Sequence, residues 1–329
     1  ALMKSMWAGA CLSSASLLKP QLMLSVLLLL LSSAPSECSF LLISSPQDKA
    51  VYYAHLLTAS EQARDERMTA RLLTKAGQVE RPMGLAVDNA RGVLYVADPG
   101  SSAVVSLRIF EEGGSRAGEL AADAPLAVLP KVAAHWVAVD SLGTVFCSDA
   151  RGHRIWSLPA GAAAARLRGG GADAAGGGGV VELYSAAGGA PIREPQGLAV
   201  DGFHLFWANG AAGGEVGSVV RGSEEELGPA PRHLATKGAA HGLCLSNSRL
   251  FYTDATDKIY STRVDGGEAV IVAEHLREPR GCAYDGDGTV FVADPALGEV
   301  LAFSGGASSL GARPLVKALD VPGAYGLAV

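Results

Sequence analysis

The sequence predicts an all-β protein, a six-bladed β-propeller whose blades are four-stranded antiparallel sheets. Three observations lead to this fold class. A unit of about 40–60 residues recurs along the chain. Each unit holds short runs of strand-forming residues that are separated by turn residues. The last residues of the sequence, Gly326–Val329, repeat a Gly-Leu-Ala-Val string that also occurs at Gly84–Val87 and at Gly197–Val200.

The repeated unit is clearest where it begins at Arg81. An apolar run (Gly84–Val87) ends at an aspartate and a turn, and a run of strand formers follows at Leu94–Asp98. A third run alternates over Val104–Ile109, and a weaker fourth run covers Pro125–Pro130. The first run aligns across the units at Gly84, Trp136, Gly197, Gly242, Gly281 and Gly326. Four short strands in a unit of this length are typical of a propeller blade.

One blade is divided between the two ends of the repeat region. Leu41–Leu56 aligns without a gap to Leu94–Ile109, which are second and third strands, and Arg67–Thr74 supplies a fourth. The first strand is missing there, whereas residues 322–329 form a first strand without the other three. We therefore expect the C-terminal strand (322–329) to join the N-terminal strands (41–74) and close a ring of six blades.

The first 37 residues differ in composition from the repeats. A ten-residue apolar run, Leu22–Leu31, is too short to span a bilayer. It fits the core of a signal peptide, with Ser32 and Ala34 as the small residues before a cleavage site. We expect residues 1–37 to be a signal peptide or a retained signal anchor, and residues 38–329 to be the propeller. The predicted location is the secretory pathway, extracellular or in an organelle lumen such as the plastid lumen, with membrane anchoring if the leader is uncleaved.

Composition restricts the other properties of the chain. A net charge of −6 argues against a basic surface for nucleic acid. The Gly/Ala-rich tract at 161–180 lies in the longest unit and predicts an irregular loop insert. Four cysteines follow the leader: Cys38, Cys147, Cys244 and Cys282. An oxidising compartment permits a disulfide among them, and their scattered spacing also fits small buried hydrophobes, so both interpretations stay open.

Several strings resemble known propellers. Leu94–Asp98, Leu250–Asp254 and Val290–Asp294 are similar to the YWTD motif of low-density-lipoprotein-receptor-type propellers, and the "PQGLAVD"-like openings resemble that family and NHL-repeat propellers. The resemblance covers about residues 39–329 and implies the six-bladed fold, with little information on function. Asn209 and Ser45 depart from the motif's aspartate, and Ser246 replaces the aspartate after the first strand.

The repeated aspartates suggest calcium binding or acid–base chemistry at first sight. They recur, however, at the same two strand ends of each unit, beside turns, where an aspartate side chain accepts hydrogen bonds from nearby backbone amides. We therefore expect a structural role for Asp88, Asp140, Asp201, Asp285, Asp98, Asp149, Asp254 and Asp294.

A more informative position comes directly before the repeated glycine. First strands line the channel of a propeller, so these residues should surround one channel mouth. They differ between blades while their neighbours repeat, which is the pattern of recognition positions rather than structural ones. The predicted channel-mouth binding residues are Met83, His135, Gln196, His241, Arg280 and Tyr325.

Two of these positions allow an enzymatic alternative. Related NHL-like propellers include lyases that hold zinc with three channel histidines on alternate blades, and the resemblance therefore raises a metal-dependent lyase or hydrolase around His135 and His241. A catalytic zinc usually has three protein ligands, and the third alternate blade offers Tyr325 instead. Gluconolactonase-like and strictosidine-synthase-like enzymes, which resemble this fold, use acidic and amide ligands in the channel, and the six-residue set contains no acid.

The sequence thus favours a non-catalytic binding or scaffold domain. We expect a protein partner, no cofactor and no catalytic residue, with long inserts at 110–124 and 161–180 adding to the surface. Retention of the leader would place the partner in a membrane assembly, of which this chain would be an accessory subunit. Membrane contact is expected only through the leader.

Overall fold

A computed structural model describes residues 39–57, 67–113, 118–169, 179–210, 216–246, 248–306 and 313–329. One compact unit covers Ser39–Val329. The predicted signal peptide or anchor (1–37) and Cys38 lie outside the described residues. In the described part of the chain, the structure contains no helix with the length and hydrophobicity needed to cross a membrane.

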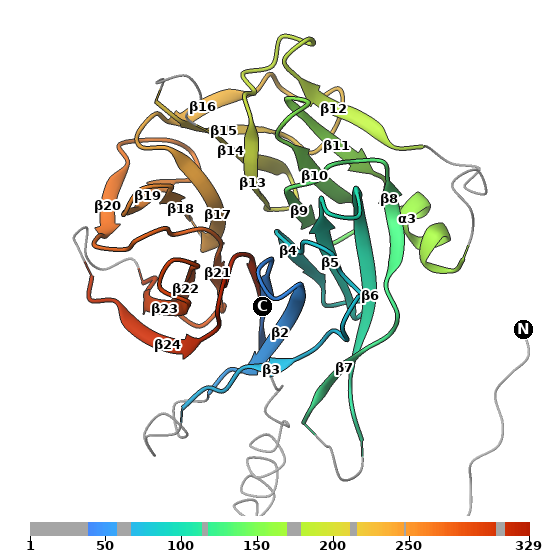
Figure 1. Cartoon of the computed structure of the whole chain (residues 1–329). Coiled ribbons are helices and arrows are strands. Elements are labelled where there is room, and N and C mark those ends of the chain that lie inside the picture. Colours follow the sequence, from blue (N-terminus) through green and yellow to red (C-terminus); the bar gives the residue numbers. More distant parts are fainter. Residues whose placement is uncertain are drawn as a thin grey trace, which may run out of the picture. The chain divides into compact units, whose positions relative to one another are not determined.

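Six sheets radiate from a central axis, as Figure 1 shows. We number these blades along the chain. Blade 1 pairs the N-terminal strands with the C-terminal one in the order β25-β1-β2-β3. Its strands are β1 (Phe40–Ser45), β2 (Ala50–His55), β3 (Arg71–Leu72) and β25 (Leu327–Ala328). The register places Leu42 opposite Ala328 and Ile43 opposite Leu327. The predicted closure of the ring is therefore confirmed.

Blades 2 and 3 carry the two predicted inserts. Blade 2 consists of β4 (Leu85–Asp88), β5 (Val93–Asp98), β6 (Ala103–Glu111), β7 (Leu120–Ala122) and β8 (Leu126–Pro130). Both β7 and β8 pair with the long strand β6, so the described residues of the 110–124 insert add a strand to the blade. Blade 3 consists of β9 (Trp136–Val139), β10 (Val145–Asp149), β11 (Arg154–Leu158) and β12 (Val181–Ser185).

The remaining blades follow the predicted order of strands. Blade 4 consists of β13 (Pro195–Val200), β14 (His204–Asn209), β15 (Ser218–Ser223) and β16 (Arg232–Ala235). Blade 5 consists of β17 (Ala240–Ser246), β18 (Arg249–Asp254), β19 (Ile259–Arg263) and β20 (Val270–Ala273). Blade 6 consists of β21 (Cys282–Tyr284), β22 (Thr289–Asp294), β23 (Glu299–Ser304) and β24 (Val316–Asp320). The all-β, six-bladed prediction is confirmed.

The expectation of an irregular loop over 161–180 is wrong for residues 161–167, and residues 170–178 lie outside the described residues. Helix α3 (Ala160–Leu167) forms there, and it buries Ala162 and Ala163 against the core between blades 2 and 3. The Arg166 guanidinium donates to the Val128 carbonyl of β8. Alanine has the highest helix propensity, and packing against an apolar surface stabilises this short alanine-rich helix.

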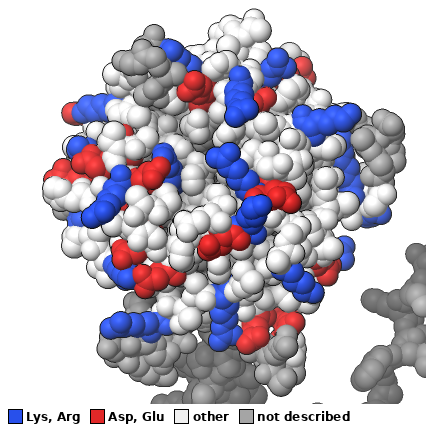
Figure 2. Space-filling view, viewed as in Figure 1, with Lys and Arg blue, Asp and Glu red and all other residues white. Residues whose placement is uncertain are grey.

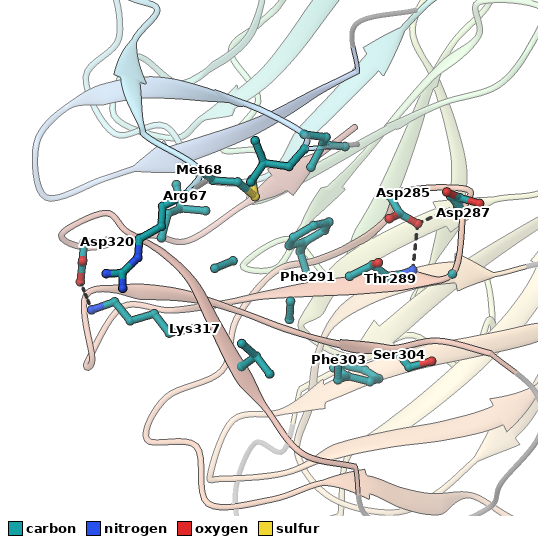
Figure 3. Close-up of a pocket in the computed structure, with 17 residues that line it drawn as sticks. Arg67, Met68, Asp285, Asp287, Thr289, Phe291, Phe303, Ser304, Lys317 and Asp320 are labelled. Atoms are coloured by element: carbon teal, nitrogen blue, oxygen red, sulfur yellow. Dashed lines mark hydrogen bonds and ion pairs between the residues drawn. The ribbon is translucent and has the colours of Figure 1, made fainter. Parts of the chain in front are cut away.

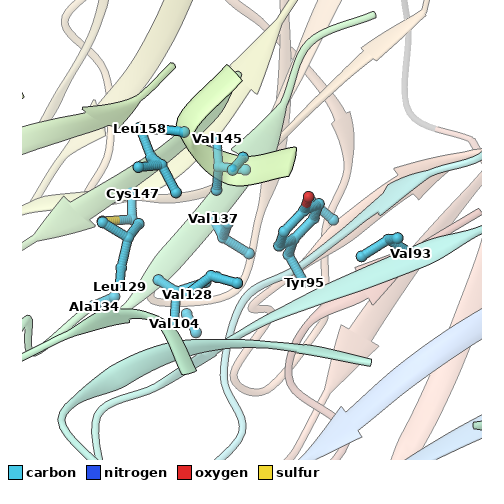
Figure 4. Packing of buried hydrophobic residues seen from close by; sticks show 14 residues of the cluster. Val93, Tyr95, Val104, Val128, Leu129, Ala134, Val137, Val145, Cys147 and Leu158 are labelled. Atoms are coloured by element: carbon cyan, nitrogen blue, oxygen red, sulfur yellow. The ribbon is translucent and has the colours of Figure 1, made fainter. Parts of the chain in front are cut away.

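The core lies between neighbouring blades rather than at one centre. Buried apolar side chains of the described residues form six clusters, one at each junction. Figure 4 shows the junction of blades 2 and 3, where Tyr95 of β5 faces Val137 of β9, and Cys147 lies fully buried beside Ala134. Each blade buries both faces only because it has two neighbours, which is why an open ring would expose apolar surface.

The repeated aspartates cap turns, as predicted. The Asp98 carboxylate accepts hydrogen bonds from the amides of Glu80 and Arg81, at 2.9 and 2.8 Å. The Asp140 carboxylate accepts from Leu142 and Thr144 in its own turn. In blade 4 the side-chain oxygen of Asn209 takes this role and accepts a hydrogen bond of 2.9 Å from the amide of Arg193.

Candidate functional site

The inner strands of the six blades form a closed ring around the channel. Each inner strand contacts the next one in the order β25, β4, β9, β13, β17 and β21, and β21 contacts β25 to complete the ring. The repeated glycines allow this close approach. A Cβ atom on Gly84 would lie 2.6 Å from the Cα of Trp136, and one on Gly281 would lie 2.5 Å from the Tyr325 carbonyl oxygen. A side chain at these positions would collide with the neighbouring strand.

In alternate blades, a hydroxyl on the second strand links the first strand to the next blade. In blade 3 the Trp136 amide donates to the Ser148 hydroxyl (3.1 Å), and that hydroxyl donates to the Gln196 carbonyl of blade 4 (2.8 Å). Thr253 makes the same two bonds in blade 5, from the Gly242 amide (2.8 Å) and to the Arg280 carbonyl (2.6 Å). We call this arrangement the hydroxyl relay.

Blade 1 holds the third relay. The Gly326 amide donates to the Ser44 hydroxyl (2.8 Å), which donates to the Met83 carbonyl of blade 2 (2.5 Å). In blades 2 and 6 an alanine takes the place of the hydroxyl residue, and the glycine amide bonds directly to the next blade. Gly84 donates to the His135 carbonyl at 3.0 Å, and Gly281 donates to the Tyr325 carbonyl at 2.8 Å.

The relays and direct bonds together hold the backbone of five predicted channel-mouth residues. The carbonyls that accept these bonds belong to Met83, His135, Gln196, Arg280 and Tyr325. The bonds use no side-chain atom of the predicted residues themselves. Side-chain identity at these positions is therefore free to vary without loss of the ring's hydrogen bonds.

Side chains from alternate blades meet across the channel. The Tyr325 hydroxyl and the His241 Nε2 share a hydrogen bond of 3.2 Å, and their rings pack edge to face with centroids 5.7 Å apart. The Trp136 indole reaches both rings, with centroid separations of 6.0 Å to His241 and 6.1 Å to Tyr325. Blades 1, 3 and 5 thus contribute one ring each to this aromatic cluster, defined as Trp136, His241 and Tyr325.

Burial controls the ionisation of the cluster. Desolvation lowers the pKa of His241 to about 3, and the positive charge of Arg280 and the neighbouring His135 act in the same direction. Desolvation also raises the pKa of Tyr325 to about 12. At neutral pH both groups are uncharged. The His241 Nδ1 atom is buried and has no hydrogen-bond partner among the described residues.

The other predicted residues lie around this cluster. His135 is partly buried, its Nδ1 lies 3.1 Å from the Ala133 carbonyl, and desolvation lowers its pKa. Arg280 forms an ion pair with Glu278 of its own blade. Met83 is almost fully buried, at 4 % exposure. The structure therefore brings His241 and Tyr325 into contact, with a tryptophan rather than His135 as the third ring.

Sequence reasoning did not identify two features of this site. Trp136 occupies a position that is glycine in the other five units, and this substitution is the visible signal that a side chain fills space there. The relay is visible as an alternation along the second strands: Ser44, Ala97, Ser148, Ala208, Thr253 and Ala293. Neither signal shows by itself which atoms are bonded.

A disulfide joins two of the inner strands. Cys244 of β17 and Cys282 of β21 are bonded, with their Cα atoms 5.6 Å apart. Of the alternatives that the sequence leaves open, these two cysteines take the disulfide, while Cys147 is a free, buried thiol. The bond lies close to two channel-mouth positions, because His241 is on β17 and Arg280 comes two residues before Cys282.

Metal binding was the alternative prediction for His135 and His241. In the described residues, no group of three or more His, Cys, Asp or Glu side chains is arranged to hold a metal ion. The Nε2 atom of His241 is bonded to Tyr325.

Comparisons with known proteins give matches of fold. No protein-family model matches the chain, and no curated protein matches it. One chain of the crystal structure of a nidogen/laminin complex is similar with a TM-score of 0.64 and 17% identity, over 88% of this chain and 97% of that one. The predicted resemblance to YWTD-type six-bladed propellers is confirmed at the level of the fold.

Two enzymes have similar structures. The gluconolactonase XC5397 from Xanthomonas campestris has a TM-score of 0.54 and 16% identity, over 89% of this chain and 88% of that one. Virginiamycin B lyase from Staphylococcus aureus has a TM-score of 0.52 and 13% identity, over 88% of this chain and 85% of that one. Catalytic and non-catalytic proteins share this fold, so the function must be argued from the site.

Proposed function

We propose that this propeller is a non-catalytic scaffold that binds a protein partner at the channel mouth. The observation that carries the proposal is the backbone support of the mouth residues. The carbonyls of five of the six are fixed by the preceding blade, and their side chains are not needed for that support. A rigid backbone with variable side chains suits recognition, because little conformational freedom is lost on binding.

The aromatic cluster forms a closely packed centre for this surface. Three rings from alternate blades meet across the channel, and Trp136 is only 3 % exposed. Around the centre of the face in view, Figure 2 shows basic and acidic side chains intermixed. A surface of mixed charge favours a protein partner over nucleic acid, which requires a concentrated positive potential.

The proposed compartment is the secretory pathway or an organelle lumen. The Cys244–Cys282 disulfide supports this proposal, because such bonds persist in oxidising compartments. Attachment to a membrane-associated assembly as an accessory subunit belongs to the same proposal and depends on the leader.

The test is an affinity purification of the tagged full-length chain, with cross-linking and mass spectrometry. We expect a co-purifying partner whose cross-links surround the channel mouth, and we expect Gln196→Arg together with Arg280→Glu to reduce its recovery. Asp123→Lys, an exposed change on blade 2, is the matched control. A monomer without a partner, or undiminished recovery by the double variant, would overturn the proposal.

A metal-dependent lyase or hydrolase is the second candidate. The buried Nδ1 of His241, which has no partner among the described residues, favours it. Metal analysis of the purified protein separates the two functions. Near-stoichiometric zinc that disappears in a His135→Ala/His241→Ala variant would support the enzyme, and its absence in the wild type would support the scaffold.

A further inference from the structure

A second surface lies at the junction of blades 6 and 1, and none of its lining residues belongs to the channel mouth. A cleft of about 790 Å³ opens there. Its size is within the range of about 300–1,000 Å³ that is usual for ligand sites. The cleft continues the apolar core of this junction, since Phe291 and Leu319 belong to that core and Leu56 and Met68 pack against it.

The cleft follows the whole outer strand of blade 6. All five residues of β24, from Val316 to Asp320, line it. β24 is the last strand of its sheet, so one of its edges has no strand beside it in the described part of the chain. Across the cleft, blade 1 ends in β3, which has only two residues. An exposed strand edge beside an apolar cleft is the arrangement that binds extended peptides.

Charge divides the cleft into two ends. Figure 3 shows Asp285 and Asp287 on one side, Arg67 and Lys317 on the other, and Met68 and Phe291 between them. The Lys317 ammonium is already paired with Asp320 (2.5 Å) and with Glu299 (3.1 Å). Neither Asp285 nor Asp287 forms an ion pair with a described residue, and Asp287 is exposed. The uncompensated charge of the cleft is therefore negative at the aspartate end.

The exposure of Val316 indicates where an apolar side chain of a ligand could bind. It is 63 % exposed although it lies in the row that joins Phe291, Ala302 and Val316 across the sheet. An apolar side chain placed over this row would be covered on both sides, by blade 6 and by Met68 of blade 1. Burying such a side chain is favourable because its apolar surface leaves water.

We infer that this cleft docks an extended segment of a partner protein that carries a basic residue followed by apolar residues. The segment lies along β24, its basic side chain faces Asp285 and Asp287, and an apolar side chain enters between Met68 and Phe291. This site is separate from the channel mouth, and it stands whether or not the channel mouth binds a partner.

The test uses the full chain and a fluorescent peptide, acetyl-Lys-Val-Leu-Val-Gly-amide, measured by fluorescence anisotropy. We expect saturable binding that falls roughly tenfold with Asp287→Lys, because a favourable charge contact at the rim becomes repulsive. Ala302→Trp fills the cleft and should abolish binding. Asp123→Lys, which changes another exposed acid, on blade 2, should leave binding unchanged.

A second peptide tests the charge requirement. Replacing its lysine by glutamate should weaken binding to the wild type and restore it in the Asp287→Lys variant. If Ala302→Trp does not fold, the charge exchange between peptide and Asp287 still decides the question. The inference is overturned if no peptide binds saturably, if both peptides bind equally, or if light scattering shows a wild-type dimer that Ala302→Trp dissociates, because a second copy would then occupy the cleft. Gln196→Arg, at the channel mouth, should not alter peptide binding.

Discussion

At the residue scale, the hydroxyls of the relay explain why alternate blades differ. Ser44, Ser148 and Thr253 each accept one backbone amide and donate to one carbonyl of the next blade. Alanine replaces the hydroxyl residue in blades 2 and 6, where the glycine amide reaches the next blade directly. The first strands of blades 1, 3 and 5 therefore reach the next blade through a side-chain hydroxyl, and those of blades 2 and 6 reach it through the backbone.

Ser148→Ala tests the relay. The substitution leaves the Trp136 amide and the Gln196 carbonyl buried without a partner, and we expect the free energy of unfolding to fall by about 1–3 kcal/mol. Equilibrium denaturation measures this loss. Ser141→Ala, at an exposed turn position of the same blade, is the control and should change stability very little. Equal stabilities of the two variants would contradict the relay.

His241 makes stability depend on pH. Its pKa is about 3 in the folded state because of burial, whereas an unfolded histidine titrates near 6.5. Below pH 6.5 the unfolded state binds a proton that the folded state excludes, so the free energy of unfolding decreases by up to about 1.4 kcal/mol per pH unit as the pH falls toward 3. The stabilisation is complete above pH 6.5.

His241→Gln should flatten this dependence. Denaturation of the variant and the wild type at pH 7, 6 and 5 measures the difference in slope. His135, whose pKa is also lowered by burial, contributes in the same direction and leaves part of the slope in place. His275→Gln, on an exposed residue, should keep the wild-type slope. A variant slope equal to that of the wild type would show that folding does not lower the pKa of His241.

At the element scale, the inner strands are held by glycines, backbone bonds and one covalent bond. The Cys244–Cys282 disulfide connects the inner strands of blades 5 and 6 across a sequence separation of 38. Both cysteines are at least nine-tenths buried, so the bond is sheltered from solvent.

Removing the disulfide should destabilise the propeller. In the chain-entropy description, closing a loop of this length lowers the entropy of the unfolded state by an amount worth about 4 kcal/mol. We expect Cys244→Ala/Cys282→Ala to lower the melting temperature and to lose the mass difference between reduced and non-reduced protein. Cys147→Ala, at a buried free thiol, should retain that mass difference. Two free thiols at positions 244 and 282 in the non-reduced wild type would refute the bond.

At the scale of the whole molecule, the ring is closed where the two-residue strand β25 meets the six-residue strand β1. Strand β25 pairs with β1, and the Tyr325 amide donates to the Ser44 carbonyl at 2.8 Å. The same segment contributes Tyr325 to the aromatic cluster. The segment that closes the ring therefore also completes the aromatic cluster.

Deleting residues 322–329 should open the ring. Blades 1 and 6 would then lose the strand that covers their shared core, which includes Leu41, Ala324 and Leu327. We expect a large fall in melting temperature and binding of a hydrophobic dye, because apolar faces of two blades become exposed. Deleting the same number of residues from the predicted leader is the control. An unchanged melting temperature after the C-terminal deletion would contradict the closure.

The sequence by itself determined the fold, because every blade of a propeller carries the same local sequence pattern. Blade number and closure are specified by the glycine positions, the capping aspartates and the shared Gly-Leu-Ala-Val string. All of these are local patterns that can be read from the sequence alone. It also identified the six positions at the channel mouth as the ones that vary, although their role in binding stays a prediction.

Only the tertiary structure decided which of these residues meet. The contact of His241 with Tyr325, the indole of Trp136 above Gly84, the pairing of Cys244 with Cys282 and the cleft beside β24 all join parts of the chain that are far apart in sequence. Helix α3 likewise depends on an apolar surface that blades 2 and 3 supply. Such contacts depend on the distances between blades, which the repeat pattern does not contain.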